Sequence, residues 1–186
     1  MDNGANSYRR YCEDGDTEGL VELIREYRDG LILYLDTFVC DINTAEELAE
    51  DTFVLLGTKK PKDKGKGSFR TWLYTIGRNI ALDHLRAVRR RNEVPLEDFA
   101  ELTDDECSLE ESFIREERRI TVHRAMKKLT PEQQQILWLV YFENFTIRDA
   151  AKLMKRSAHA AETLAYRARK ALKAILTEEG FVYEEL

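Results

Sequence analysis

The sequence predicts an all-α protein of two small helical domains joined by an acidic linker. Only nine glycines and three prolines interrupt its 186 residues, and apolar residues recur at helical spacing along most of the chain. The net charge of −6 is unevenly spread: residues 1–56 carry −10, 57–91 carry +9, 92–117 carry −10, 118–176 carry +9 and the tail carries −4. Two basic blocks around an acidic one indicate two polyanion-binding modules and a spacer, although solvated helix faces give the same pattern. We expect domains at 1–92 and 118–177, a linker at 93–117 and a tail at 178–186.

The first basic block is preceded by two predicted helices. Residues 1–16 are polar, and we expect them to be frayed. Apolar spacing predicts a helix from Thr17 to about Val39, in which Gly30 can introduce a kink. A turn over residues 41–43 and a capping box of Thr44 with Glu47 predict a second helix, 46–56. Residues 57–66, GTKKPKDKGK, are typical of a lysine-rich loop.

The stretch from 67 to 91, GSFRTWLYTIGRNIALDHLRAVRRR, predicts a long helix capped by Ser68. Its apolar residues follow helical spacing, and its other face is polar and mostly cationic. Aromatic rings beside arginines suit bases pulled from a stack, because rings stack on bases and guanidinium groups hold phosphate. An ordinary amphipathic helix with a solvated basic face remains an equal alternative on periodicity alone.

The second basic block predicts a helix-turn-helix. A helix beginning near Arg118 is followed by Thr130, Pro131 and Gln133, a strong helix start. Its core face is expected to be Ile136, Leu137, Val140 and Tyr141, and a turn follows at Asn144 and Phe145. Thr146 then caps a short alanine-rich helix and Ser157 caps a long one to about Leu176. Helical hairpins that bind no DNA share this pattern.

Several other classes of protein are disfavoured. Three cysteines and three histidines lie far apart, so we expect no disulfide framework, no metal site and no cofactor. The amino terminus does not resemble a signal peptide, and no apolar run approaches the roughly twenty residues of a membrane span, so we expect a cytoplasmic protein without membrane insertion. A nucleic-acid enzyme would need clustered carboxylates near the basic face, where Asp63 and Asp83 are the only acids.

The 67–91 stretch resembles the second conserved region of bacterial RNA polymerase sigma factors of the extracytoplasmic-function (ECF) group, whose usual form is close to GSFRAWLYRIARNLALDYLRRRRR. The preceding EELAEDTFVLL resembles their core-binding motif. The resemblance implies a region 2 helical bundle that binds core RNA polymerase and the minus-ten element of promoter DNA. The implied core-binding residues, an acidic rim around an exposed phenylalanine, are Glu47, Leu48, Glu50, Asp51, Phe53 and Leu56. The implied minus-ten residues are Phe69, Arg70, Trp72, Arg78, Asn79, Asp83, Arg86, Arg89 and Arg90.

The stretch LTPEQQQILWLVYFENFTIRDAAKLM…RARKAL resembles region 4 of the same group, whose helix-turn-helix reads the minus-thirty-five element. The implied contacts are Ser157, His159, Ala160, Glu162, Thr163, Arg167, Arg169 and Lys170. The recognition helix departs from the usual VGTVKSRLSRARKKL at Ala160, Glu162 and Leu164. Phosphate repels a glutamate, although Glu162 can accept a hydrogen bond from a cytosine amino group. We therefore expect that the protein either reads an unusual minus-thirty-five sequence or makes weak use of that element.

The resemblance therefore implies a non-catalytic initiation subunit whose partners are core RNA polymerase and promoter DNA, with an anti-sigma factor as a further candidate partner. The acidic linker would run through the RNA-exit channel of the polymerase, although generic solubilising linkers look the same. The alternative is a stand-alone helix-turn-helix regulator that binds duplex DNA without polymerase. Such a regulator has no use for the motifs of the first basic block.

Overall fold

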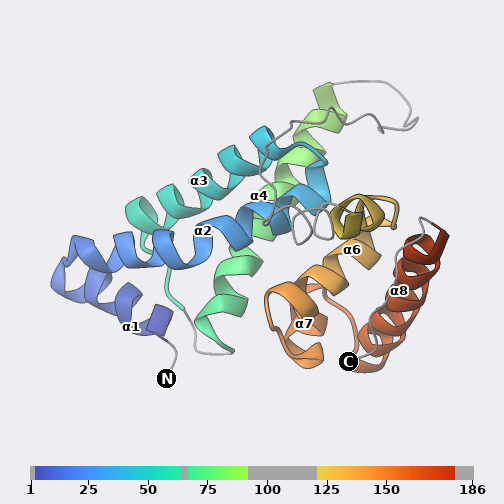
Figure 1. The fold of residues 1–186 in the computed structure, drawn as a ribbon. Coiled ribbons are helices and arrows are strands. Elements are labelled where there is room, and N and C mark those ends of the chain that lie inside the picture. Colours follow the sequence, from blue (N-terminus) through green and yellow to red (C-terminus); the bar gives the residue numbers. More distant parts are fainter. Residues whose placement is uncertain (1–2, 64–66, 92–120, 179–186) are drawn as a thin grey trace, which may run out of the picture.

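The computed structural model describes residues 3–63, 67–91 and 121–178, which form helices and connecting turns without a strand. The N-terminal lobe (residues 3–91) and the C-terminal lobe (residues 121–178) lie side by side (Figure 1). The expected linker, 93–117, and all but the first residue of the expected tail lie outside the described residues. No helix in the described ranges is long and apolar enough to cross a membrane.

The N-terminal lobe is built on three long helices, α2 (Thr17–Val39), α3 (Ile42–Lys59) and α4 (Phe69–Arg91). The short connection between α2 and α3 makes them antiparallel neighbours, and α4 packs across both (Figure 1). The α2 helix continues through Gly30 without a break. Ser68 accepts a hydrogen bond from the backbone N–H of Thr71 at 3.2 Å, so the predicted cap of α4 is confirmed.

The start of α3 and the following loop differ from the prediction. Asp41, rather than Thr44, caps α3: its carboxylate accepts a hydrogen bond from the backbone N–H of Thr44 at 2.9 Å. Ile42 and Asn43, which were predicted to lie in a turn, therefore already belong to α3. The helix begins earlier because the Asp41 carboxylate can satisfy a free backbone N–H three residues further along the chain. At the other end, α3 runs to Lys59, so the lysine-rich loop is shorter than its composition suggested.

The expectation that residues 1–16 are frayed is wrong for residues 3–14. They contain α1 (Asn3–Arg9) and the π-helix η1 (Arg10–Asp14). Tyr8 is buried and its ring lies 5.6 Å from that of Phe69 and 5.2 Å from that of Trp72. Gly4 approaches so closely that an added Cβ would lie 2.7 Å from the hydroxyl of Tyr27. Through Tyr8 and Gly4 this polar segment thus covers the first turn of α4, a contact that carries no periodic signal.

The C-terminal lobe begins with a helical segment at 121–127 and continues with α6 (Pro131–Leu137), the π-helix η2 (Trp138–Phe142), α7 (Ile147–Leu153) and α8 (Ala158–Glu178). The backbone N–H of Thr130 donates to Gln133 at 3.1 Å, which confirms that half of the predicted capping box. Thr146 and Ser157 accept hydrogen bonds from the backbone N–H groups of Asp149 (3.1 Å) and Ala160 (3.2 Å), as predicted for caps.

One predicted core face is partly wrong. Ile136 and Leu137 are buried, but Tyr141 is 51% exposed and Leu139 is buried instead. The cause is η2: each π-turn contains one residue more than an α-turn, so the apolar stripe shifts around the helix after Leu137. Trp138 and Phe142 consequently stack, with ring centroids 4.5 Å apart.

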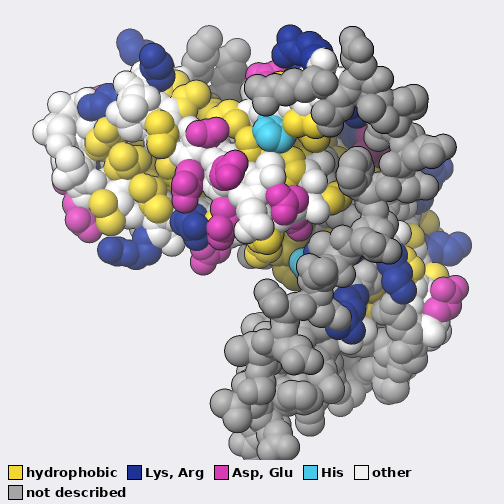
Figure 2. Space-filling view, turned by 90° about the horizontal axis from the view of Figure 1, so that it is seen from above, with side chains coloured by type: hydrophobic (Ala, Val, Ile, Leu, Met, Phe, Trp, Pro, Cys, Tyr) yellow, Lys and Arg dark blue, Asp and Glu magenta, His cyan; other side chains and the backbone are white. Residues whose placement is uncertain are grey.

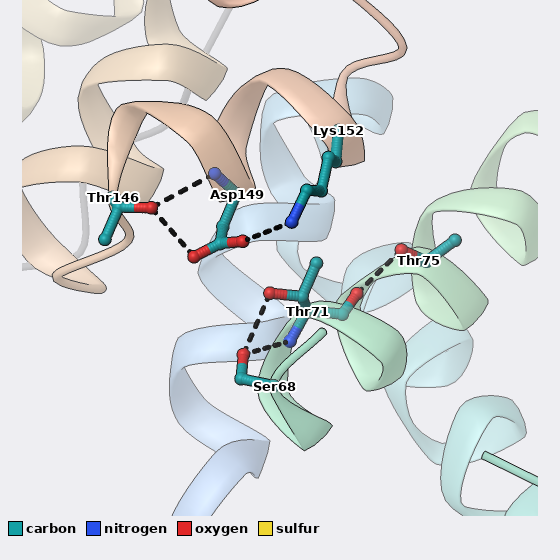
Figure 3. A network of polar contacts seen from close by, with 6 residues as sticks. All are labelled: Ser68, Thr71, Thr75, Thr146, Asp149 and Lys152. Atoms are coloured by element: carbon teal, nitrogen blue, oxygen red, sulfur yellow. Dashed lines mark hydrogen bonds and ion pairs between the residues drawn. The ribbon is translucent and has the colours of Figure 1, made fainter. Parts of the chain in front are cut away.

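The two lobes pack against each other. Their buried apolar residues form one continuous core, and the rings of Tyr74 in α4 and Phe145 before α7 lie 5.3 Å apart. In Figure 3 the first turns of α4, with Ser68 and Thr71, face the capped start of α7, with Thr146 and Asp149. The structure thus adds an interlobe interface to the predicted two-domain arrangement.

Candidate polymerase and nucleic-acid interfaces

The exposed face of α3 carries the acidic part of the predicted core-binding set. Glu47, Glu50 and Asp51 are exposed, and Val54, 59% exposed, lies beside them at helical spacing. Figure 2, seen from the side of α3, shows acidic side chains gathered in the middle of this face next to hydrophobic ones. An apolar side chain within an acidic rim suits a basic helical partner.

The apolar part of that set lies inside the protein. Phe53 is only 6% exposed, and Leu48 and Leu56 are buried with it in the lobe core. The expectation of an exposed phenylalanine is therefore wrong: Phe53 follows Ala45 and Ala49 along the buried stripe of α3. Val54 is the exposed apolar residue that the sequence reasoning missed. A helical wheel that included Ala45 and Ala49 would have placed Phe53 on the buried face of the helix and Val54 on the exposed face.

The predicted minus-ten residues occupy several faces of α4. Asn79, Asp83, Arg86 and Arg90 share one exposed face, and Arg86 forms an ion pair with Asp83 at 2.7 Å. Arg86, Arg89 and Arg90 line a shallow, open hollow at the end of the helix. Concentrated guanidinium groups on an open surface can hold phosphate oxygens.

The predicted aromatic contacts are enclosed in this conformation. Phe69 is buried, with its ring 5.9 Å from that of Tyr27 and 5.3 Å from that of Trp72, and Trp72 is half-buried. Phe69 therefore offers no face to a base in this conformation. It packs α1 and α2 onto the first turn of α4.

Arg70 points away from the other arginines and into the interface between the lobes. At roughly 100° per residue, Arg70 and Arg86 lie on nearly opposite faces of α4. One Arg70 nitrogen lies 3.1 Å from a carboxylate oxygen of Glu143, and another donates to the backbone carbonyl of that residue. Arg78 is half-buried and lies between these two directions, roughly 80° from each. The structure therefore does not bring Arg70 together with the exposed arginines.

Glu143 also accepts a hydrogen bond from the Tyr74 hydroxyl at 2.6 Å. Glu143 is 7% exposed and Tyr74 is fully buried, so the carboxylate lies between a cation and a phenol away from water. Burial, and then the neighbouring Glu143 carboxylate, raise the pKa of Tyr74 well above its usual range. The phenol stays protonated and remains a hydrogen-bond donor. Arg70, Tyr74 and Glu143 are called the interlobe cluster below.

The long helix α8 presents the predicted minus-thirty-five residues on the outer side of the C-terminal lobe (Figure 1). Its buried stripe is Ala161, Ala165 and Ala168, and the exposed residues of the predicted set are Ser157, His159, Glu162, Arg167, Arg169 and Lys170. Ala160 and Thr163 are partly exposed, and the Thr163 hydroxyl donates to the carbonyl of His159 at 3.0 Å. Tyr166, 61% exposed, lies one turn after Glu162 and was missed because a lone tyrosine carries no spacing signal.

Comparison with known proteins matches both halves of the chain. The family model for Sigma-70 region 2 matches residues 23–91, and the model for Sigma-70 region 4 matches residues 119–172. Among curated proteins, the ECF RNA polymerase sigma factor BldN of Streptomyces coelicolor is 27% identical over 91% of this chain and 64% of its own length. The RNA polymerase sigma-H factor of Pseudomonas aeruginosa is 29% identical over 85% of this chain and 86% of its own length.

Two solved structures share the fold. The sigma factor RpoE of Bartonella quintana, solved with the anti-sigma factor NepR, is 21% identical with a TM-score of 0.63, covering 84% of this chain and 95% of its own. CnrH, solved with the cytosolic domain of CnrY, is 19% identical with a TM-score of 0.62, covering 95% and 96%. With regions 2 and 4 matched in order along one chain, the protein belongs to the ECF group of the sigma-70 family of RNA polymerase sigma factors.

Proposed function

We propose that the chain binds core RNA polymerase and directs it to promoters as a cytoplasmic initiation subunit without a catalytic step of its own. Residues 1–92 act as region 2 and residues 118–177 as region 4, joined by the linker at 93–117. The observation that carries the proposal is the presence of both regions, in order, with an acidic-rimmed surface on α3 and cationic surfaces on α4 and α8.

Each exposed surface has a separate role. The α3 face of Glu47, Glu50, Asp51 and Val54 docks the core polymerase. The exposed face of α4, with Asn79, Arg86, Arg89 and Arg90, holds the melted minus-ten strand, and α8 enters the upstream major groove. An anti-sigma factor that covers these faces would keep the chain inactive.

Promoter capture with and without polymerase tests the proposal. Fluorescent promoter DNA is titrated with the chain alone, with core polymerase alone and with both. We expect tight, sequence-dependent binding only from the mixture, because the acidic surfaces of the free chain oppose DNA. Tight operator binding by the chain alone would instead support the stand-alone regulator.

A pair of charge reversals tests the docking face. Glu50→Lys on α3 should weaken association with core polymerase at least tenfold. Glu26→Lys makes the same charge change at an exposed position of α2 and should leave association unchanged. Equal effects of the two substitutions would show that only the net charge of the chain affects association, and would refute the assignment of the α3 face as the polymerase-docking surface.

A further inference from the structure

The interlobe cluster joins residues far apart in the sequence. Arg70 and Tyr74 belong to α4 in the N-terminal lobe, and Glu143 is the residue that caps the end of η2 in the C-terminal lobe. The Arg70 side chain is 35% exposed, and its guanidinium lies 5.8 Å from the ring centroid of Tyr27 and 5.6 Å from that of Phe145. The group most suited to a phosphate at the start of α4 is thus occupied by a carboxylate and two aromatic rings.

Gly30 of α2 makes room for this arrangement. A Cβ on Gly30 would lie 2.7 Å from the Tyr74 hydroxyl and would collide with the Glu143 carboxylate. Glu143 cannot swing aside at little cost, because Arg70 and Tyr74 both hold its carboxylate. A glycine costs a helix interior roughly 1 kcal/mol relative to alanine, so its presence here favours closure of the lobes over stability of α2.

One hydrogen-bond donor of the interlobe cluster lacks an acceptor. Within the described residues, no group accepts a hydrogen bond from the buried Nε of Arg70. A buried ion pair must offset the desolvation of both charges, and an incompletely bonded guanidinium offsets less of it. Separation of the lobes would return Arg70 to water or to a phosphate, so the closed arrangement is poised to open.

We propose that Glu143 acts as an intramolecular latch: it closes the C-terminal lobe over the start of α4 and withholds Arg70 from nucleic acid until the lobes separate. The proposal deepens the proposed function, since it assumes that Arg70 serves DNA binding once exposed. In the closed chain the carboxylate occupies the position that a DNA phosphate would take on Arg70. Only the exposed arginines farther along α4 remain available.

Two variants open the latch by different physical routes. Glu143→Gln removes the charge but keeps the size of the side chain, which leaves Arg70 without its ion-pair partner. Gly30→Ala changes no charge and wedges a methyl group against Glu143 and Tyr74. Glu132→Gln is the matched control, because it removes one charge from the exposed ion pair of Glu132 with Arg156 in the same lobe. Helical content measured by circular dichroism confirms that each variant folds.

Lobe separation is measured in the full chain by electron spin resonance between labels at Val54→Cys and Ala174→Cys, with the native cysteines replaced by serine. Wild type and Glu132→Gln should give one short distance distribution. Glu143→Gln and Gly30→Ala should give a second, longer distribution. Unchanged distances in both latch variants, or a broad distribution in the wild type, would overturn the latch.

Binding of a single-stranded promoter oligonucleotide, measured by fluorescence anisotropy, tests the withholding of Arg70. Both latch variants should bind about tenfold more tightly, because the apparent Kd falls as the competent fraction rises. Arg70→Gln should open the lobes without that gain. Opening without tighter binding in Glu143→Gln or Gly30→Ala, or a gain in binding by Arg70→Gln, would refute the role of Arg70. Absence of promoter-dependent transcription by the wild type with core polymerase would instead refute the proposed function.

Discussion

Two neighbouring residues of α3 should respond to truncation in opposite ways. Phe53 is 6% exposed and belongs to the lobe core, whereas Val54 is 59% exposed on the acidic face. Replacing a buried phenylalanine by alanine costs about 3–5 kcal/mol. Ala49, one turn earlier on the same stripe, is too small to fill the space, so we expect about 4 kcal/mol for Phe53→Ala. Val54→Ala should change the free energy of unfolding by less than about 0.5 kcal/mol.

Urea denaturation followed by circular dichroism measures both values. With a denaturant dependence of about 2 kcal/mol per molar urea, the midpoint of Phe53→Ala should fall by about 2 M and that of Val54→Ala should stay in place. Association with core polymerase, measured under conditions where both variants are folded, should weaken for Val54→Ala and be retained by Phe53→Ala. A Phe53→Ala variant of unchanged stability that fails to bind polymerase would refute the burial argument.

Three further substitutions have defined outcomes. Thr146→Ala should lower the free energy of unfolding by about 1 kcal/mol at pH 7, because it removes the cap of α7. The Thr146 hydroxyl also lowers the pKa of Asp149 in the folded chain. The stability from this contact is therefore present above the pKa of Asp149 in the unfolded chain and is lost as the pH falls through its pKa in the folded chain. Urea denaturation of Thr146→Ala should accordingly show a smaller loss of stability at pH 3 than at pH 7. Burial raises the pKa of Asp36 in the last turn of α2, so its ionised form opposes folding at neutral pH. Asp36→Asn should therefore raise the free energy of unfolding at pH 7 by about 0.5 kcal/mol, which is measured as a higher melting temperature. This gain should vanish below the pKa of Asp36 in the unfolded chain, where the carboxyl is protonated in both states. Glu162→Gln should move the preference of the upstream contact from cytosine toward adenine in a selection from randomised promoters, and an unchanged preference would show that Glu162 does not face a base.

The parts of the fold that depend on local chemistry could be predicted from the sequence. Ser68, Thr146 and Ser157 cap their helices as expected, because a cap needs only a side-chain oxygen and free N–H groups within three residues. The start of α3 shows the limit of this reasoning, since Asp41 and Thr44 both satisfy the rule and the earlier residue is used.

What could not be predicted depends on register or on distant contacts. Phe53 and Val54 are consecutive, and a rotation of roughly 100° decides which of them is buried. The π-turn of η2 shifted the register after Leu137 and exposed Tyr141. The interlobe cluster joins Arg70 to Glu143, and no periodicity within either segment reports that approach. The expected role of Arg70 in DNA binding therefore came from the family resemblance. Its enclosure between the two lobes could be learned only from the structure.

Run-off transcription from a library of randomised promoters tests the central claim most directly. The reaction contains purified core polymerase with and without the chain. Transcripts that start at a defined sequence only when the chain is present, and that disappear with Arg86→Ala but not with Arg25→Ala on α2, are the predicted result. Transcripts of the same sequence preference from core polymerase alone, or none in the presence of the chain, would contradict it.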